Sequence, residues 1–229
     1  MPQIPNTSLH FLIELAHNNT REWFQANKKR WEGVKSNFEE TIRDLIRRIG
    51  QFENLDGVRV QDCNYRIARD VRFSPDKSPY KTWLSASFGE GGRKSGKMDY
   101  YLHIQPGGES FLGGGMYEAD AVQLAKFRQE VDYNSEGLKS IINAPEFLNH
   151  FGKPYGNSLK TAPKGYPKDH PEIELLRHTQ LFFYHKFTDQ EVTSPQFTEW
   201  VEKSCLILKP YLDFLNVIFE ESSEQKFEL

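Results

Sequence analysis

A stretch of ten residues, RFSPDKSPYK at positions 72–81, combines three cations with two prolines and two serines. The Ser74-Pro75 and Ser78-Pro79 pairs predict tight turns, and Pro79 keeps the residue before it extended, so no ordinary helix passes through the stretch. Rigid loops that carry Arg and Lys suit anions, because a guanidinium offers a planar fork to phosphate or carboxylate and an ammonium offers a point charge. The stretch therefore indicates an anion site.

The excess of cations begins a few residues earlier. Residues 66–81 hold five cations and two acids, a local balance of +3 in a chain whose formal net charge is -3. Aromatic and imidazole side chains nearby are expected to complete the site by stacking or hydrogen bonding. The candidate ligand-binding residues are Arg66, Arg69, Arg72, Lys77, Tyr80, Lys81, His103 and Tyr117. No catalytic residue is assigned.

Arg69 is the most informative of these residues. Residues 65–73, YRIARDVRF, alternate between apolar and polar types, which predicts a strand whose apolar face would include Arg69. A guanidinium buried in this way needs an anion beside it. Its partner is either an internal carboxylate, such as Asp70, Asp76 or a distant glutamate, or an anionic ligand, and both interpretations stay open.

Two further features have a functional and a structural interpretation. His103 shares a predicted strand face with Tyr101 and Gln105, where it would serve as a general base or as a hydrogen-bonded structural side chain. The glycines at 113–115 precede a predicted helix, so they would let a phosphate approach backbone N–H groups or would allow a bulge or close packing of the backbone.

A second basic segment follows later in the chain. Lys160, Lys164 and Lys168 lie near Tyr166 in a region rich in Gly and Pro. This region is either a second wall of the same anion site or a solvated loop.

The sequence contains no pattern typical of a metal or cofactor site. His170, His178 and His185 have no metal-ligand spacing, and neither Cys63 nor Cys205 lies in a zinc-type motif. We therefore expect no metal, no cofactor and no disulfide framework.

The elements that must position these residues follow from hydrophobic periodicity. Helices are expected first, then a run of strands, then further helices, one more strand and a last helix, which is the segregated order of an α+β protein. We predict a central, mostly antiparallel sheet flanked by helices at both ends of the chain, in a single domain of residues 1–229. Helices are predicted at 8–17, from Asn19 to Gly50, at 119–133, 135–143, 145–151 and 171–178, and from Pro195 with a kink or break at Pro210; strands are predicted at 65–73, 83–88, 100–105, 110–112 and 180–187.

Composition narrows the class of protein. Hydrophobic residues make up 38% and charged residues 27% of the chain, which is typical of a folded protein. No apolar run reaches the roughly 20 residues of a membrane span, and the first residues, MPQIPNTSLHFL, lack the pattern of a signal peptide. We expect a cytoplasmic protein that does not contact a membrane, and the pI near 6.2 disfavours nucleic acid as a partner.

Several motifs in order along the chain resemble a known family. They are NNTREWFQANKKRWE, RDVRFSPDKSPYKTW, YYLHIQPG followed by GGGMY, and APKGYPKDHPEIELL. The chain resembles, over nearly its full length, the uncharacterised proteins grouped as domain of unknown function 2461. The resemblance implies one intact domain and supplies no catalytic residue.

Three hypotheses of function follow. The first is a binding protein or enzyme for a small anionic or phosphorylated ligand, held by the Arg- and Lys-rich loop 66–81. The second is a protein-interaction or scaffold domain without catalysis, in which the loop meets an acidic partner or its own acids. The third, which the acidic pI disfavours, is a nucleic-acid-associated protein whose basic loops at 66–81, 93–97 and 160–168 follow phosphates. The sequence does not determine the oligomeric state.

Overall fold

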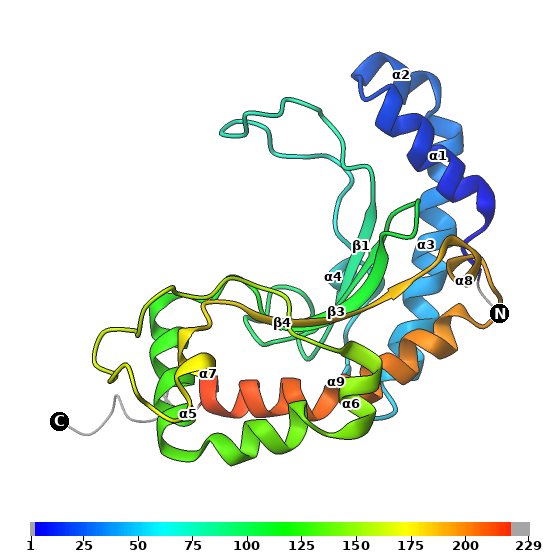
Figure 1. Cartoon of the computed structure of the whole chain (residues 1–229). Helices are drawn as coiled ribbons and strands as arrows, with labels where there is room; N and C mark the ends of the chain where they lie inside the picture. Colours follow the sequence, from blue (N-terminus) through cyan, green and yellow to red (C-terminus); the bar gives the residue numbers. More distant parts are fainter. Residues whose placement is uncertain (1–2, 221–229) are drawn as a thin grey trace. The chain divides into compact units, whose positions relative to one another are not determined.

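A computed structural model describes residues 3–220 of the chain (Figure 1). Helices come first, three strands follow, and the second half of the chain is helical apart from one more strand. The helices are α1 (Asn6–His17), α2 (Arg21–Ala26), α3 (Lys28–Ile49), α4 (Val60–Cys63), α5 (Ala121–Ile142), α6 (Pro145–Phe151), α7 (Ile173–Arg177), α8 (Asp189–Val192) and α9 (Phe197–Glu220); the strands are β1 (Leu84–Phe88), β2 (Tyr100–Ile104), β3 (Ser110–Met116) and β4 (Leu181–Phe187).

The four strands form one antiparallel sheet in the order β1-β2-β3-β4. The predicted α+β class, with a central antiparallel sheet and helices at both ends of the chain, is therefore confirmed. No helix within residues 3–220 is both long enough and apolar enough to cross a membrane.

The chain forms two compact units. Within residues 3–220, the first unit holds residues 3–112 together with Lys186–Cys205, and the second holds Gly113–His185 together with residues 206–220. Strands β3 and β4 and helix α9 each contribute residues to both units. The single domain expected over residues 1–229 stays a prediction.

The pairing of β1 with β2 gives this part of the sheet two unlike faces. Ser85 lies opposite His103 and Ser87 lies opposite Tyr101, and these side chains share one face because residues alternate along a strand. The side chains of the other face are apolar and buried, and helix α3 packs against β1. The buried side chains of this face are Leu84, Ala86, Phe88, Tyr100, Leu102 and Ile104.

The first helices begin at different residues from those predicted. We expected Asn19 to cap a helix running to Gly50, but Thr20 caps α2 by accepting a hydrogen bond from the Trp23 backbone N–H, and the helix is interrupted at Asn27. The long apolar period of α3 is as predicted, with Val34, Phe38, Ile42, Leu45 and Ile49 buried. Asn19 instead hydrogen bonds the backbone of Tyr80.

The predicted strand at residues 65–73 is wrong. Only Ala68 forms a bridge, with Tyr80, and the backbone N–H groups of Arg69 and Lys81 donate to the carbonyls of Pro79 and Ile67. Residues 66–81, which we call the basic loop, come just before β1 in the chain. They form the turquoise hairpin in Figure 1. The apolar face that should have buried Arg69 does not exist, and Phe73 is 94% exposed.

The glycines at 113–115 lie inside β3, so they do not form a loop before a helix. A Cβ atom at Gly113 would stand 2.6 Å from the Phe183 carbonyl oxygen, and one at Gly115 would stand 2.6 Å from the Leu181 carbonyl oxygen. These contacts support the close-packing interpretation. The amino terminus of α5 is capped by Asp120, whose carboxylate accepts from the Val122 and Gln123 backbone N–H groups.

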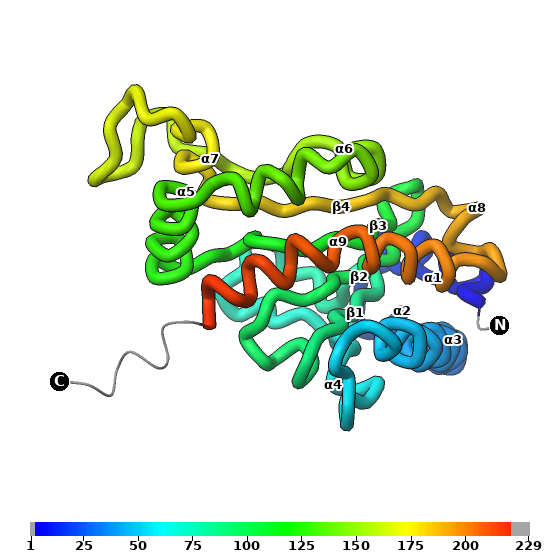
Figure 2. The backbone as a smooth tube through the Cα atoms, turned by 90° about the horizontal axis from the view of Figure 1, so that it is seen from below, coloured from blue at the N-terminus to red at the C-terminus, as the bar shows by residue number. Residues whose placement is uncertain are grey.

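Helix α9 continues through Pro210 without a break (Figure 2). The break that was one of the two expectations at this proline is therefore wrong, and the kink stays a prediction. Tyr211, the next residue, is fully buried and its hydroxyl donates to the Leu181 carbonyl at 2.6 Å.

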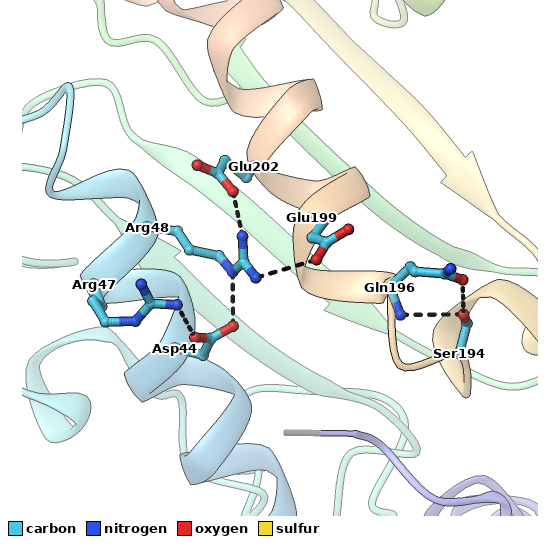
Figure 3. A network of polar contacts seen from close by, with 7 residues as sticks. All are labelled: Asp44, Arg47, Arg48, Ser194, Gln196, Glu199 and Glu202. Atoms are coloured by element: carbon cyan, nitrogen blue, oxygen red, sulfur yellow. Dashed lines mark hydrogen bonds and ion pairs between the residues drawn. The ribbon is translucent and has the colours of Figure 1, made fainter. Parts of the chain in front are cut away.

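Helix α3 is joined to the first turns of α9 by a network of charges around Arg48 (Figure 3). The Arg48 side chain is only 14% exposed. Its guanidinium lies 2.8 Å from Asp44, 2.6 Å from Glu202 and 3.6 Å from Glu199. Burial opposes ionisation of Asp44, but hydrogen bonds from Arg47 and Arg48 hold the pKa of that carboxyl below its usual value.

Replacing Arg48 should destabilise the protein, because it would leave the partly buried carboxylates of Asp44 and Glu202 without their cation. We predict that Arg48→Met lowers the free energy of unfolding by about 2–4 kcal/mol, measured by urea denaturation. The matched control is Arg47→Met, since Arg47 is 62% exposed and also pairs with Asp44, and its loss should be within about 0.5 kcal/mol. Equal losses from the two variants would contradict the structural role of Arg48.

Candidate functional site

The tip of the basic loop is closed on itself by Arg69. The Arg69 guanidinium pairs with Asp76 and donates to the Ser78 carbonyl and the Ser74 hydroxyl. Asp76 also accepts from the Ser78 hydroxyl and backbone N–H, and these bonds together with Arg69 hold the pKa of its carboxyl well below the usual range. Arg69 therefore has the internal carboxylate partner that was one of its two interpretations.

The other cations at the tip also have partners within the loop. The exposed Arg72 guanidinium pairs with Asp70 at 2.7 Å. The Lys77 ammonium donates to the backbone carbonyls of Val71 and Arg72. The positive charges of Arg69, Arg72 and Lys77 at the tip thus already have partners within the loop, which the sequence did not determine.

Tyr80 anchors the base of the basic loop to the first helices. Its ring stacks on Phe24 with the ring centroids 3.9 Å apart. The Asn19 side chain accepts from the Tyr80 backbone N–H and donates to the Tyr80 carbonyl, at 3.1 Å and 2.9 Å. Tyr80 is therefore held by contacts within the protein. The Asn19 side chain satisfies the backbone N–H and carbonyl of Tyr80, as a neighbouring strand would in a sheet.

Lys81 differs from the cations at the tip. Its side chain is partly buried, and its ammonium lies over the rings of Tyr65 and Trp83, 5.2 Å and 5.9 Å from their centroids. Within residues 3–220 no carboxylate lies at ion-pair distance from this ammonium. Burial lowers the pKa of the Lys81 amine, and the positive charges of Arg66 and Arg93 lower it further.

The two arginines belong to different loops that meet beside Tyr65. Arg66 is exposed on the basic loop, and Arg93 comes from the segment between β1 and β2. The Arg93 guanidinium lies 5.4 Å from the Tyr65 ring centroid and donates to the Asn64 carbonyl at 3.0 Å. In the part of the chain that the structure describes, neither arginine forms an ion pair. We call Lys81, Arg66 and Arg93 the cation cluster.

Aromatic side chains stand in a row across the strands next to the cation cluster. His103 is stacked between Trp83 and Phe111, with centroid distances of 5.5 Å and 4.9 Å. Its Nε2 donates to the Gln105 side-chain oxygen at 3.0 Å, which leaves Nδ1 to accept from the Tyr101 hydroxyl at 3.5 Å. Burial lowers the pKa of His103 and the charge of Lys81 adds to this shift, whereas the hydrogen bond with Gln105 opposes it.

Hydroxyl groups complete the same face of the sheet. Ser85 is 2% exposed, and its Oγ has no hydrogen-bond partner in the structure. Ser87 Oγ lies 3.2 Å from the Tyr65 hydroxyl and also hydrogen bonds the Asp99 carboxyl. A chain of polar groups therefore runs from Asp99 through Ser87 to the phenol beside Lys81.

Asp99 and Cys63 are the titratable groups that burial perturbs most in this region. Burial raises the pKa of Asp99 to about 6, although hydrogen bonds from Ser87 and from the backbone oppose the shift. Burial also raises the pKa of the Cys63 thiol to about 12, which makes this side chain a poor nucleophile. No group of three or more His, Cys, Asp or Glu residues suited to a metal ion occurs among residues 3–220.

The remaining candidates lie in the second compact unit. Tyr117 follows β3, is 48% exposed and packs edge-on against Phe182. Lys160, Lys164 and Lys168 are exposed, and their proposed role as a second wall stays a prediction. Of the eight candidates, Arg66, Lys81 and His103 belong to the polar sheet face with the cation cluster, whereas Arg69, Arg72, Lys77 and Tyr80 have partners in or near the basic loop.

Sequence reasoning missed several residues of this face, namely Tyr65, Ser85, Ser87, Arg93, Asp99 and Phe111. Arg93 lies in the segment 93–97, which the sequence connected only with nucleic-acid binding, and Asp99 follows that segment. The signal that would have found Ser85 and Ser87 is strand alternation, because they share a face with Tyr101 and His103 in the β1–β2 register.

The fold and this site define an α+β protein whose sheet has two unlike faces. One face is apolar, and the other is polar and lies beside the cation cluster. The model of the family described as Conserved hypothetical protein (DUF2461) matches residues 7–214, so the chain belongs to the DUF2461 family. The resemblance seen in the sequence motifs is confirmed. No curated protein and no solved structure matches the chain.

Removing Arg69 should open the tip of the basic loop without unfolding the protein. We predict that Arg69→Ala speeds hydrogen exchange of residues 69–78, because the pair with Asp76 and the bond to the Ser78 carbonyl are lost. The global free energy of unfolding should fall by less than about 1 kcal/mol, since the pair is near the surface. The control Arg72→Ala should leave exchange at the Arg69 amide unchanged, and global unfolding of Arg69→Ala would contradict this local role.

The perturbed pKa of Asp99 predicts a pH dependence of stability. Since the pKa of this carboxyl is raised in the folded state to about 6, its stabilising contribution is complete below about pH 4 and is lost as the pH rises through 6. Relative to Asp99→Asn, the wild-type protein should lose up to about 3 kcal/mol of unfolding free energy between about pH 4 and pH 8. Urea denaturation across this range checks it.

The control for this experiment is Asp56→Asn, because Asp56 is exposed. Its stability curve should run parallel to that of the wild-type protein. A curve for Asp99→Asn that also stays parallel would show that Asp99 ionises normally in the folded protein.

Proposed function

We propose that this protein binds a small anionic ligand, carrying a phosphate or a carboxylate, on the polar face of β1 and β2. The observation that carries the proposal is the Lys81 ammonium, which is partly buried without a carboxylate partner in the described chain. A buried cation is normally paired, because the loss of hydration is costly. Here the neighbouring charges of Arg66 and Arg93 add repulsion, which an anion between them would turn into attraction.

Neutral donors on the same face support the proposal. The Ser85 hydroxyl is buried and has no hydrogen-bond partner among residues 3–220, although an unsatisfied buried polar group is destabilising by about 1–3 kcal/mol. An anionic oxygen next to Ser85 would accept its hydrogen bond. The His103 imidazole, opposite Ser85 in the register, adds a polar group whose charged form is disfavoured by burial.

The contacts at the tip of the basic loop favour its base as the binding region. Arg69, Arg72 and Lys77 already pair with Asp76, Asp70 or loop carbonyls, so a ligand would have to compete with these partners. Within residues 3–220 no carboxylate lies at ion-pair distance from the cation cluster, although the Arg93 guanidinium donates to the Asn64 carbonyl. We therefore assign the tip a structural role and the cation cluster the binding role.

Nucleic acid is less favoured by the geometry of the rings. Trp83, His103 and Phe111 lie nearly parallel to one another at spacings close to the distance between neighbouring strands. Rings arranged in this way stand on edge above the sheet, so their faces contact one another. A base-stacking platform needs free ring faces.

A protein-interaction role remains the second candidate because of one observation. Phe73, at the tip of the basic loop, is 94% exposed, and the Arg72 guanidinium lies 5.9 Å from its ring centroid. An exposed aromatic ring beside an arginine is the pairing found at the centres of many protein interfaces. The tip and the cation cluster involve different residues, so separate variants test the two candidates.

The proposed location is the cytoplasm. Cys63 and Cys205 are both buried and free, as is usual for proteins kept under reducing conditions.

A thermal-shift titration with inorganic phosphate tests the proposal. At about 100 times its dissociation constant, phosphate should add about 2.7 kcal/mol of stability, which for a chain of this length raises Tm by roughly 5–10 °C. Lys81→Met should lose most of this rise, because it keeps the apolar stem and removes the charge. The ionic strength is held constant with sodium chloride.

Two controls make the titration specific. Lys94→Met removes an exposed lysine from the segment that also carries Arg93, and its Tm rise should match the wild-type value. Phe73→Ser should also leave the rise unchanged. The proposal fails if neither phosphate nor a dicarboxylate stabilises the wild-type protein, or if Lys81→Met responds as the wild type does; the first result would favour the protein-interaction role.

A further inference from the structure

The backbone of Tyr80 needs hydrogen-bond partners that the rest of the basic loop does not supply. Tyr80 forms an isolated bridge with Ala68, and the hydrogen bonds of this bridge are made by the residues on either side of the pair. In an antiparallel bridge of this kind, the N–H and carbonyl groups of the two central residues point away from each other. The outer edge at Tyr80 therefore depends on a group from outside the loop.

Asn19 supplies both partners with one side chain. Its Oδ1 accepts from the Tyr80 backbone N–H at 3.1 Å, and its Nδ2 donates to the Tyr80 carbonyl at 2.9 Å. An amide side chain carries a donor and an acceptor next to each other, so it can pair with a strand edge as another strand would. A carboxylate at this position would lack the donor and would satisfy only one of the two groups.

The turn that carries Asn19 is itself fixed at both ends. On one side, the Asn18 backbone N–H and side-chain amide both donate to the Glu14 carbonyl near the end of α1, at 3.0 Å and 2.9 Å. On the other side, the Thr20 backbone N–H donates to the Asn18 carbonyl at 2.7 Å, and the Thr20 side chain caps α2. Asn19 thus holds Tyr80 at a defined place relative to the first two helices.

The placement of Tyr80 determines the direction of the next side chain, Lys81. Neighbouring side chains in an extended chain point to opposite sides. The Tyr80 ring stacks on Phe24 of α2, so Lys81 points the other way, where its ammonium lies over the rings of Tyr65 and Trp83. Contacts with the faces of these rings favour the charged amine. The hydrogen bonds of Asn19 therefore help to hold a charged lysine in one position.

We propose that Asn19 is a positioning residue of the anion site, which places the Lys81 ammonium over its two aromatic rings by holding the backbone of Tyr80. The inference rests on the proposed function, in which Lys81 binds the anion. Asn19 acts through Lys81 and does not contact the ligand. Its effect is preorganisation, because an anion that meets a lysine already in place does not have to order that side chain and the loop backbone on binding.

The first test follows the position of Lys81 without any ligand. Aromatic ring currents shift the NMR signals of protons that lie over a ring face, so the Lys81 Hε signals should lie upfield of those of the exposed Lys94. In Asn19→Ala the Lys81 signals should move towards the Lys94 values, because the backbone of Tyr80 loses both bonds. Lys81→Met assigns the signals.

The second test measures the dissociation constant of inorganic phosphate by isothermal titration calorimetry. Asn19→Ala should bind phosphate roughly three- to tenfold more weakly than the wild-type protein, which is the factor expected for ordering one long side chain on binding. Asn19→Ser, whose shorter side chain cannot span both groups of Tyr80, is measured in parallel and should show the same two changes. Circular dichroism establishes that each variant is folded.

The matched control is Asn27→Ala. The Asn27 side chain donates to the Trp23 carbonyl at 2.9 Å and accepts from Arg30 at 3.0 Å. This variant also loses two hydrogen bonds among the first helices, so its Tm should fall by an amount similar to that of Asn19→Ala. Its phosphate affinity and its Lys81 signals should stay at the wild-type values.

The possible outcomes separate this inference from the proposed function. Displaced Lys81 signals and weaker phosphate binding in the Asn19 variants, but not in Asn27→Ala, would support both. Displaced signals in a protein whose wild type binds no phosphate would overturn the proposed function and leave Asn19 as the residue that places Lys81. Unchanged signals in the Asn19 variants, or the same changes in Asn27→Ala, would overturn the positioning role, and phosphate binding by the wild type would then leave the anion site intact.

Discussion

The antiparallel pairing of β1 with β2 determines where the side chains of the candidate site stand. Side chains alternate along each strand, so placing Leu84, Ala86 and Phe88 in the core on one face obliges Ser85 and Ser87 to lie on the other face. A slip of the register by one residue would turn these apolar side chains out of the core, and the loss of their burial would destabilise the fold. The polar face is therefore a consequence of forming the core.

The first compact unit contains two partly buried cations, Arg48 and Lys81, whose neighbours carry opposite charges. Arg48 is surrounded by three carboxylates and joins α3 to the start of α9, so its charge serves the fold. Lys81 has rings and arginines as neighbours and no carboxylate at ion-pair distance in the described residues, so its charge is balanced only by contacts with the Tyr65 and Trp83 rings. Such an imbalance is more typical of functional sites than of structural ones. It is the reason for placing the ligand at the base of the basic loop.

The sequence predicted the elements with strong periodicity better than it predicted the site. The α+β class, the apolar face of α3 and the strands that became β1, β2 and β4 could be predicted, because each has a clear period and length. The strand predicted at 65–73 is absent, because alternation does not reveal whether a partner strand exists. The tip of the basic loop is instead held by the pair of Arg69 and Asp76. Lys81 and His103 were identified as candidates from the sequence. Arg93 was not, because the folding of the segment between β1 and β2 brings it near Lys81, and no local sequence pattern predicts that contact.

The pKa of the Lys81 amine tests the central claim most directly. Nuclear magnetic resonance of the lysine side chains, with Lys81→Met used to assign the signal, can follow its titration with and without inorganic phosphate. In the free protein the pKa should lie below the ordinary value of 10.5, because of burial and the charges of Arg66 and Arg93. Phosphate should raise it, since a bound anion favours the charged amine. An ordinary pKa that phosphate does not change would contradict the claim that Lys81 is an unpaired cation at an anion site.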